Sequence, residues 1–194
     1  MRQLLPAVAD DVDPLTTYLA ASRPTPADRP WVAMNMVTSL DGATAVDGRS
    51  GPLGGAPDRA AFRAVRAMAD VVLVAAGTVR VEGYGPVRLP EEAVAARVAV
   101  GRSDGPPRLA VVSASLDVDL RRVAEGPVRP LVLTTDDADP DRRAGLEELA
   151  EVRTHGRGQV DLVAALAGLR ADGAEVVVCE GGPTLNAALV SADL

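Results

Sequence analysis

The sequence contains no lysine and very few of the side chains on which most enzyme chemistry depends. All 20 basic residues are arginine, which excludes a P-loop lysine, a Schiff-base lysine and a pyridoxal-phosphate anchor. The one histidine, His155, cannot build a two-histidine zinc site, and the one cysteine, Cys179, cannot form a disulfide or a CxxC centre. His155 lies in a polar segment, and no G-x-S-x-G elbow accompanies it. We therefore expect no metal site, and either chemistry carried by a bound cofactor or no chemistry at all.

The sequence also has few aromatic residues, no long apolar run and no excess of positive charge, and these absences exclude several classes of protein. Aromatic residues make up 2% of the chain, so its core must be built from Val, Leu, Ala and Met. No apolar run approaches the roughly 20 residues of a membrane helix, and residues 1–14 lack a signal-peptide core. The net charge of -7 argues against a nucleic-acid or anionic-membrane partner. With no disulfide framework, we expect a cytoplasmic protein.

Apolar runs bounded by turn residues alternate with segments of helical periodicity. Strands are expected at 31–38, 71–76, 109–113, 131–135, 152–154 and 176–179, with a short return at 44–46 after the Asp41-Gly42 turn. Helices are expected at 57–69, 91–100, 140–150, 161–171 and 183–191, and a short one begins at Asp13-Pro14. This alternation predicts an α/β fold with a mostly parallel sheet flanked by helices on both faces. Residues 1–29 are expected to form an N-terminal extension, and 30–194 one domain.

Two predicted strand ends carry residues suited to a ligand. Gly77 lets the backbone approach closely, and Thr78 either binds a phosphate oxygen or simply caps the next helix. The second strand runs into Glu180, two glycines and a proline that can begin a helix. That segment fits either a pyrophosphate cradle or an ordinary Gly-Gly turn with a surface glutamate. Because a phosphate would be repelled by Glu180, we interpret this side chain as an acceptor for a second ligand.

Several polar residues elsewhere are candidates with ordinary structural alternatives. Arg63, Arg66 and Arg88 could bind a phosphorylated substrate by bidentate contacts, or could be solvated arginines. Asp41 precedes Gly42 in a turn, which is common hairpin chemistry. No G-x-G-x-x-G fingerprint follows the first strands, which counts against an ordinary Rossmann dehydrogenase.

Taken together and in order, four segments resemble the reductase domain of the riboflavin-biosynthesis deaminase–reductases. The segments are Ser39-Leu40-Asp41-Gly42-Ala43-Thr44-Ala45, Arg66-Ala67-Met68-Ala69-Asp70-Val71-Val72-Leu73-Val74, Gly77-Thr78-Val79 and Glu180-Gly181-Gly182-Pro183-Thr184-Leu185. The similarity runs from about Trp31 to the C-terminus and is strongest to stand-alone actinobacterial members. It implies a dihydrofolate-reductase-like three-layer fold, NADPH as cofactor, and a homodimer.

The resemblance also implies a reaction and a set of site residues. The substrate would be a small phosphorylated pyrimidine, 5-amino-6-(5-phosphoribosylamino)uracil, reduced at the ribose C1′. The implied NADPH contacts are Thr38, Thr78, Glu82, Gly181, Gly182, Pro183, Thr184 and Leu185. The implied substrate contacts are Arg66, Arg88 and Glu180, with both arginines on the phosphate. Asp41 and Glu180 are the catalytic candidates, Asp41 for handling a proton.

The sequence departs from the family pattern in four places. Leu53 stands where an aromatic residue often lies near the cofactor. Glu82 stands where aspartate is usual, and its spacing to Arg88 is one residue shorter. The family normally continues with further strands beyond the position of Leu194, so we expect either that the sequence is a piece of a longer protein or that the sheet lacks that edge. No zinc-deaminase signature is present. Two alternatives stay open, namely a reductase of dihydrofolate or another pterin, and a non-catalytic nucleotide-binding module.

Overall fold

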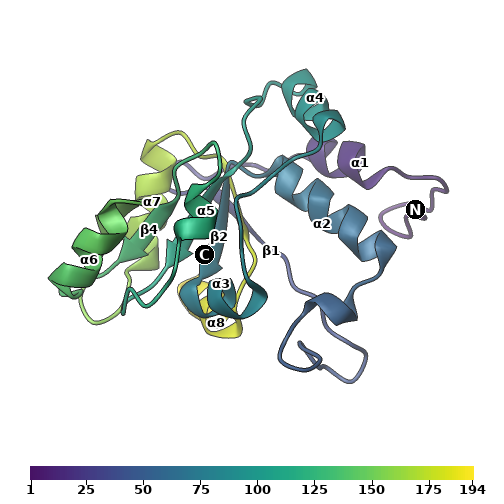
Figure 1. Cartoon of the computed structure of the whole chain (residues 1–194). Coiled ribbons are helices and arrows are strands. Elements are labelled where there is room, and N and C mark those ends of the chain that lie inside the picture. Colours follow the sequence, from purple (N-terminus) through teal and green to yellow (C-terminus); the bar gives the residue numbers. More distant parts are fainter.

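A computed structural model describes all 194 residues, and its centre is a six-stranded sheet (Figure 1). Every strand pairs in parallel with its neighbours, in the order β1-β6-β2-β3-β4-β5. The strands are β1 (Trp31–Met34), β2 (Val71–Ala75), β3 (Arg108–Val112), β4 (Leu131–Thr134), β5 (Glu151–Thr154) and β6 (Val176–Cys179). The predicted α/β class with a parallel sheet is therefore confirmed.

Eight α-helices and one 3-10 turn accompany the strands. The helices are α1 (Pro14–Ala20), α2 (Ala56–Met68), α3 (Ala76–Glu82), α4 (Glu91–Ala99), α5 (Arg121–Ala124), α6 (Pro140–Glu147), α7 (Leu162–Ala171) and α8 (Pro183–Ser191), and the 3-10 turn is η1 (Gly51–Leu53). Helix α1 precedes β1, α8 follows β6, and the others lie between strands. Asp13, Asp139 and Asp161 cap α1, α6 and α7 by accepting hydrogen bonds from first-turn N–H groups. None of the helices has the length and hydrophobicity needed to cross a membrane.

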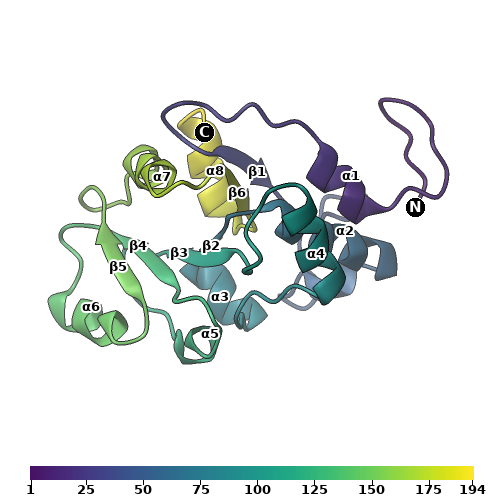
Figure 2. The same ribbon diagram turned by 90° about the horizontal axis from the view of Figure 1, so that it is seen from above.

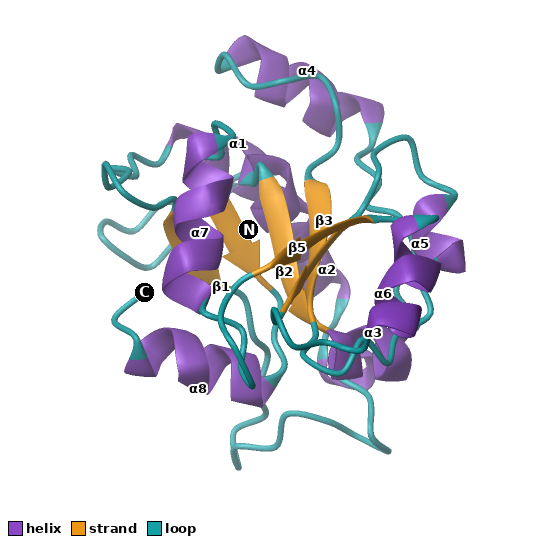
Figure 3. Ribbon diagram, turned by 90° about the vertical axis from the view of Figure 1, so that its left-hand side faces the viewer, coloured by secondary structure: helices purple, strands orange, loops and turns teal.

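The helices cover the sheet on both faces, and alternate residues of each strand supply the two cores. In β2, Val72 and Val74 pack toward α2, α3, α5 and α6, whereas Val71 and Leu73 pack toward α7 and α8. Figures 2 and 3 show α7 and α8 on one side of the sheet, with α3, α5 and α6 on the other. Because both faces are covered, the central strands are continuous apolar runs, as expected for parallel strands.

The first predicted strand is shorter than expected, and its predicted return strand is absent. The last backbone bond along β1 joins the Asn35 N–H to the Cys179 carbonyl at 2.8 Å. Beyond it the partner strand β6 has ended, so residues 35–38 leave the sheet. Ser39 to Ala43 close a tight turn, but Val46 pairs only with Arg49 in an isolated bridge. Without a neighbouring strand, residues 44–46 cannot extend the sheet.

Two helices were missed by the sequence prediction, and one of them corrects the role given to Thr78. Helix α3 begins at Ala76, immediately after β2, and α5 is a single short turn. Ala75 occupies the N-cap position of α3, with no side-chain cap. Thr78 therefore lies inside the first turn and does not cap the helix. In Figure 1, α3 and α8 both lie at the lower edge of the sheet, beside residues that follow β1.

Candidate functional site

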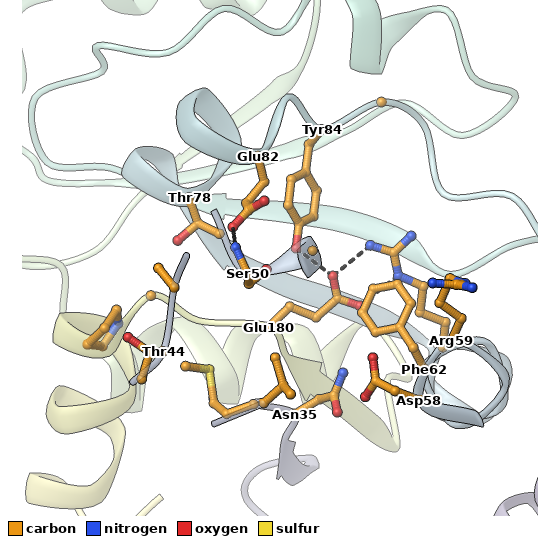
Figure 4. A pocket seen from close by; sticks show the side chains of 18 of the residues that line it. Asn35, Thr44, Ser50, Asp58, Arg59, Phe62, Thr78, Glu82, Tyr84 and Glu180 are labelled. Carbon is orange, nitrogen blue, oxygen red and sulfur yellow. Dashed lines mark hydrogen bonds and ion pairs between the residues drawn. The ribbon is translucent and has the colours of Figure 1, made fainter. Parts of the chain in front are cut away.

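A cavity of about 530 Å³ opens at the carboxyl ends of β1, β2 and β6. This is where ligands gather in parallel α/β sheets. Its walls come from α2, α3, the segment after β1 and the turn after β6. The lining residues are Asn35, Met36, Val37, Thr44, Ala45, Ser50, Gly51, Asp58, Arg59, Phe62, Arg66, Thr78, Glu82, Tyr84, Gly85, Pro86, Glu180, Gly182 and Pro183 (Figure 4).

The carboxylate of Glu180 stands at the centre of a hydrogen-bonded cluster. Arg66 donates from Nε to Glu180 Oε1 and from Nη2 to Oε2, both at 2.7 Å. Tyr84 donates its hydroxyl to Oε2, also at 2.7 Å. The Glu180 side chain is only 2% exposed, so these donors replace the water that a buried carboxylate loses. The cluster joins α2, the end of α3 and the end of β6.

Burial and charge together set the protonation of this cluster. Burial raises the pKa of Tyr84, and the adjacent Glu180 carboxylate raises it further. Burial alone would lower the pKa of Arg66, but its hydrogen bonds to Glu180 and the charge of that carboxylate raise it overall. The Arg66 guanidinium also lies 4.3 Å from the ring centre of Phe62, a cation–π contact. Tyr84 and Arg66 are therefore fixed hydrogen-bond donors to Glu180.

The opposite wall of the cavity is formed where α3 and α8 begin. A Cβ built on Gly182 would lie 3.0 Å from Thr78 Oγ1, so only glycine leaves this approach free. At the N-terminus of α8, no side chain caps the first-turn N–H groups. Such groups fit the pyrophosphate of a nicotinamide dinucleotide. Thr78, Gly182 and Pro183, all predicted cofactor contacts, thus share one wall.

Glu82 has an additional role that the sequence did not indicate. Its Oε1 accepts a hydrogen bond of 2.8 Å from the Ser50 N–H, as the dashed line in Figure 4 shows. This bond ties the segment that precedes η1 to the last turn of α3. Glu82 lines the cavity, but one of its oxygens is committed to the protein itself.

Six predicted site residues lie outside the lining of this cavity, for different reasons. Thr38, Arg88 and Thr184 are exposed, and Leu185 is buried in the core beneath α8. Gly181 is buried, and its carbonyl accepts a 2.7 Å hydrogen bond from the Ala75 N–H. The sixth is Asp41. Arg63, which was a further candidate, is an exposed residue of α2. Of the three candidate arginines, only Arg66 lines the cavity.

Asp41 lies exposed in the turn that follows β1. It accepts hydrogen bonds from the Ser39 hydroxyl and, at 3.3 Å, from the Ala43 N–H. These bonds, chiefly that from Ser39, lower the pKa of Asp41. The carboxyl group is therefore ionised at neutral pH and cannot donate a proton, and its lowered pKa also makes it a weak base.

The cavity contains residues that the sequence interpretation did not select, chiefly on α2. Asp58, Phe62 and Arg66 are spaced at i, i+4 and i+8, and Arg59 lies one position after Asp58. Residues three or four positions apart lie on the same face of a helix. Counting back from Arg66 by four and eight residues would therefore have identified Phe62 and Asp58 from the sequence. No comparable local signal marks Tyr84, which reaches Glu180 from 96 positions away.

Comparison with known proteins adds a family assignment and named relatives. Residues 30–194 match the family model described as the RibD C-terminal domain. A 2,5-diamino-6-ribosylamino-4(3H)-pyrimidinone 5′-phosphate reductase from Methanothermobacter thermautotrophicus is 29% identical over 166 residues, covering 86% of this chain and 74% of the relative. The protein of that name from Archaeoglobus fulgidus is 28% identical over 167 residues, covering 86% and 76%.

Solved structures share the fold. A pyrimidine reductase-like protein from Corynebacterium diphtheriae superposes with a TM-score of 0.80 at 29% identity, covering 93% of this chain and 77% of that one. A diaminohydroxyphosphoribosylaminopyrimidine deaminase/5-amino-6-(5-phosphoribosylamino)uracil reductase from Thermotoga maritima has a TM-score of 0.62 at 24% identity. This chain covers 42% of that larger protein, and we take the likeness as one of fold.

Proposed function

Because this chain belongs to the RibD C-terminal domain family, we propose that it is an NADPH-dependent oxidoreductase of riboflavin biosynthesis. Its proposed reaction is the reduction of 5-amino-6-(5-phosphoribosylamino)uracil, or a closely related ribosylaminopyrimidine phosphate, at the ribose C1′. Two curated relatives named as pyrimidinone 5′-phosphate reductases support this reaction class.

The observation that carries the proposal is the arrangement of the two walls of the cavity. Thr78, Gly182 and Pro183 line it where α3 and α8 begin, and Glu180 lines it beside Arg66. Residues expected to contact the cofactor and residues expected to contact the substrate therefore border a single cavity. A hydride can pass between two ligands only when they are held in contact, so a shared cavity is what the reaction requires.

The residues of the cavity support specific roles. NADPH, when bound, supplies the hydride. We propose that the uncapped N–H groups of α8 and the Thr78 hydroxyl hold the cofactor, with Thr38, Glu82, Gly181, Thr184 and Leu185 as the further contacts that the resemblance implies. Glu180 Oε1 accepts from Arg66 alone and keeps an acceptor site for a substrate hydroxyl or amino group.

Proton transfer must accompany the hydride, since an imine that gains a hydride gains a proton to become an amine. Asp41 and Glu180 remain our catalytic candidates. Glu180 lines the cavity, held by Arg66 and Tyr84. Asp41 lies in an exposed turn outside the cavity lining, so it would handle a proton only if that turn moved toward the ligand.

A kinetic comparison of substrates tests the proposal. NADPH oxidation at 340 nm would be followed with three compounds, which are the phosphoribosylaminouracil, the 2,5-diaminopyrimidinone analogue and dihydrofolate. We expect turnover with one or both ribosylaminopyrimidine phosphates and none with dihydrofolate. Turnover of dihydrofolate alone would establish the pterin reductase instead. Tight NADPH binding without any turnover would establish a non-catalytic nucleotide-binding module.

The remaining proposals concern organisation. We propose that residues 1–29 form an extension to a reductase domain at 30–194. We also propose a cytoplasmic location, from the composition, and a homodimer, as the resemblance implies. In the structure, the extension includes α1, which contributes Tyr18 and Leu19 to the packing around the core. Light scattering after size-exclusion chromatography would test the dimer.

A further inference from the structure

One wall of the cavity is a long segment that is joined to the rest of the protein by very few directional contacts. Residues 36–53 contain no regular element except η1, and none of them is buried. They form no ion pair, and only one of their hydrogen bonds reaches a residue outside the segment. The position of this wall therefore depends strongly on that one hydrogen bond. The residues of the segment that line the cavity are Met36, Val37, Thr44, Ala45, Ser50 and Gly51.

That hydrogen bond joins the Ser50 N–H to Oε1 of Glu82, the last residue of α3, at 2.8 Å (Figure 4). Glu82 also lines the cavity, and its second oxygen, Oε2, accepts no hydrogen bond within the protein. A carboxylate is a strong acceptor for a backbone N–H. The same peptide is bound on its other side, because the Arg49 carbonyl accepts a 2.8 Å hydrogen bond from the Val46 N–H. Both polar groups of the peptide between Arg49 and Ser50 are therefore bound while Glu82 holds it.

We infer that Glu82 is a positioning residue, which holds residues 36–53 in place as a wall of the cavity and links that wall to the bound cofactor. The link rests on the proposed function, because that proposal supplies the cofactor. Helix α3 carries both Glu82 and Thr78, one of the residues proposed to hold NADPH. A cofactor bound along α3 stabilises the position of Glu82 that holds the segment, and by reciprocity the held segment favours the bound cofactor. Oε2 of Glu82 stays available to a cofactor hydroxyl.

Limited digestion with trypsin tests this role in the protein without ligands. Trypsin cleaves after arginine or lysine, and Arg49 is the only such residue between positions 36 and 53. Cleavage there requires the Arg49–Ser50 peptide to leave Glu82, so its rate follows the population in which the segment is released. Glu82→Ala should raise this rate roughly tenfold to hundredfold, the range for a lost hydrogen bond to a charged group. Glu82→Gln, which keeps a neutral acceptor, should give an intermediate rate.

A second loop of the chain provides a matched control. The peptide between Arg157 and Gly158 is bound in the same manner, since the Gly158 N–H donates to Asp137 Oδ1 at 3.0 Å, and these residues lie outside the cavity lining. Mass spectrometry reads both cleavage sites in one digest. Glu82→Ala should accelerate cleavage after Arg49 alone, and Asp137→Ala cleavage after Arg157 alone. An unchanged rate after Arg49 in Glu82→Ala, or an equal acceleration at both sites, would overturn the inference.

The link to the cofactor is tested by repeating the digestion with NADPH. NADPH should slow cleavage after Arg49 in the unmodified protein and should protect Glu82→Ala less, because that variant lacks the group that connects α3 to the segment. Equal protection of the two proteins would refute the link. A protein that binds no NADPH would refute the proposed cofactor, and the digestion without ligands would still decide whether Glu82 holds the segment.

Discussion

At the scale of single residues, Glu180 shows how a carboxyl group is held in the interior of the protein. It follows β6, whose four residues are all buried, and its own side chain is 2% exposed. A carboxylate so placed is stable only when donors replace its hydration. Arg66 supplies two of these donors and Tyr84 a third. Two of the four aromatic residues in the chain, Phe62 and Tyr84, lie around this ion pair.

Removing the Tyr84 hydroxyl should therefore destabilise the protein and weaken the site. We expect Tyr84→Phe to lower the free energy of unfolding by about 1–2 kcal/mol, since it deletes a hydrogen bond to a charged acceptor. It should also lower kcat/KM, because Glu180 is then held by Arg66 alone. Urea denaturation and steady-state kinetics measure the two effects. Tyr18→Phe is the matched control, because the Tyr18 hydroxyl makes no hydrogen bond within the protein. Equal losses in the two variants would refute the assigned role.

At the scale of elements, the site depends on two helices that begin at, or within three residues of, the end of a strand. Helix α3 starts directly after β2, and only three residues separate β6 from α8. The two helix starts are joined by the 2.7 Å hydrogen bond from the Ala75 N–H to the Gly181 carbonyl. They also approach where Thr78 Oγ1 faces Gly182. This close approach leaves little room for a side chain at position 182 on that wall of the cavity.

A methyl group at Gly182 should push these two helix starts apart. We expect Gly182→Ala to cost about 1–2 kcal/mol of folding stability, as overpacked sites do, and to raise KM for NADPH. Adding Thr78→Ala should recover part of the lost stability, because it removes the atom that the new methyl group meets. Gly145→Ala on α6 is the control, since a Cβ there meets nothing within 4 Å. Thermal or urea denaturation of the unmodified protein, both single variants, the double variant and the control measures the coupling, and strictly additive changes would argue against the contact.

At the scale of the whole molecule, the chain combines one sheet with a cavity at its carboxyl edge. Its net charge of -7 opposes the approach of anionic ligands in general. The proposed binding of a dinucleotide and a phosphorylated substrate would therefore depend on local donors in the cavity, such as the α8 N–H groups, and not on the overall field. A ligand that binds these groups binds the folded state only.

NADPH should consequently stabilise the whole protein. At a concentration of about 100 times its Kd, the gain is about 2.7 kcal/mol, which corresponds to a Tm rise of roughly 5–10 °C for a chain of this size. Differential scanning calorimetry with increasing NADPH would measure it, with AMP as a control that lacks the pyrophosphate and nicotinamide. A Tm that NADPH leaves unchanged would count against the proposed cofactor.

Much of the fold was predictable because its signals are local. The runs at Val71–Ala75 and Val176–Cys179 are apolar throughout, which is typical of strands buried on both faces. The strand at 31–38 was predicted too long, because its end depends on where β6 stops. Helix α3 was missed because it begins at an alanine, with no loop and no side-chain cap before it.

The sequence by itself determined the strand order along the chain, the family, and the residues that stand at the ends of β2 and β6. These features follow from apolar runs and short motifs, which depend only on residues close together in the sequence. Only the tertiary structure decided what those residues contact. Arg66 and Glu180 lie 114 positions apart, and their pairing depends on how α2 packs against the sheet. That packing determines which arginine of α2 forms an ion pair with Glu180, and this cannot be predicted from neighbouring residues in the sequence.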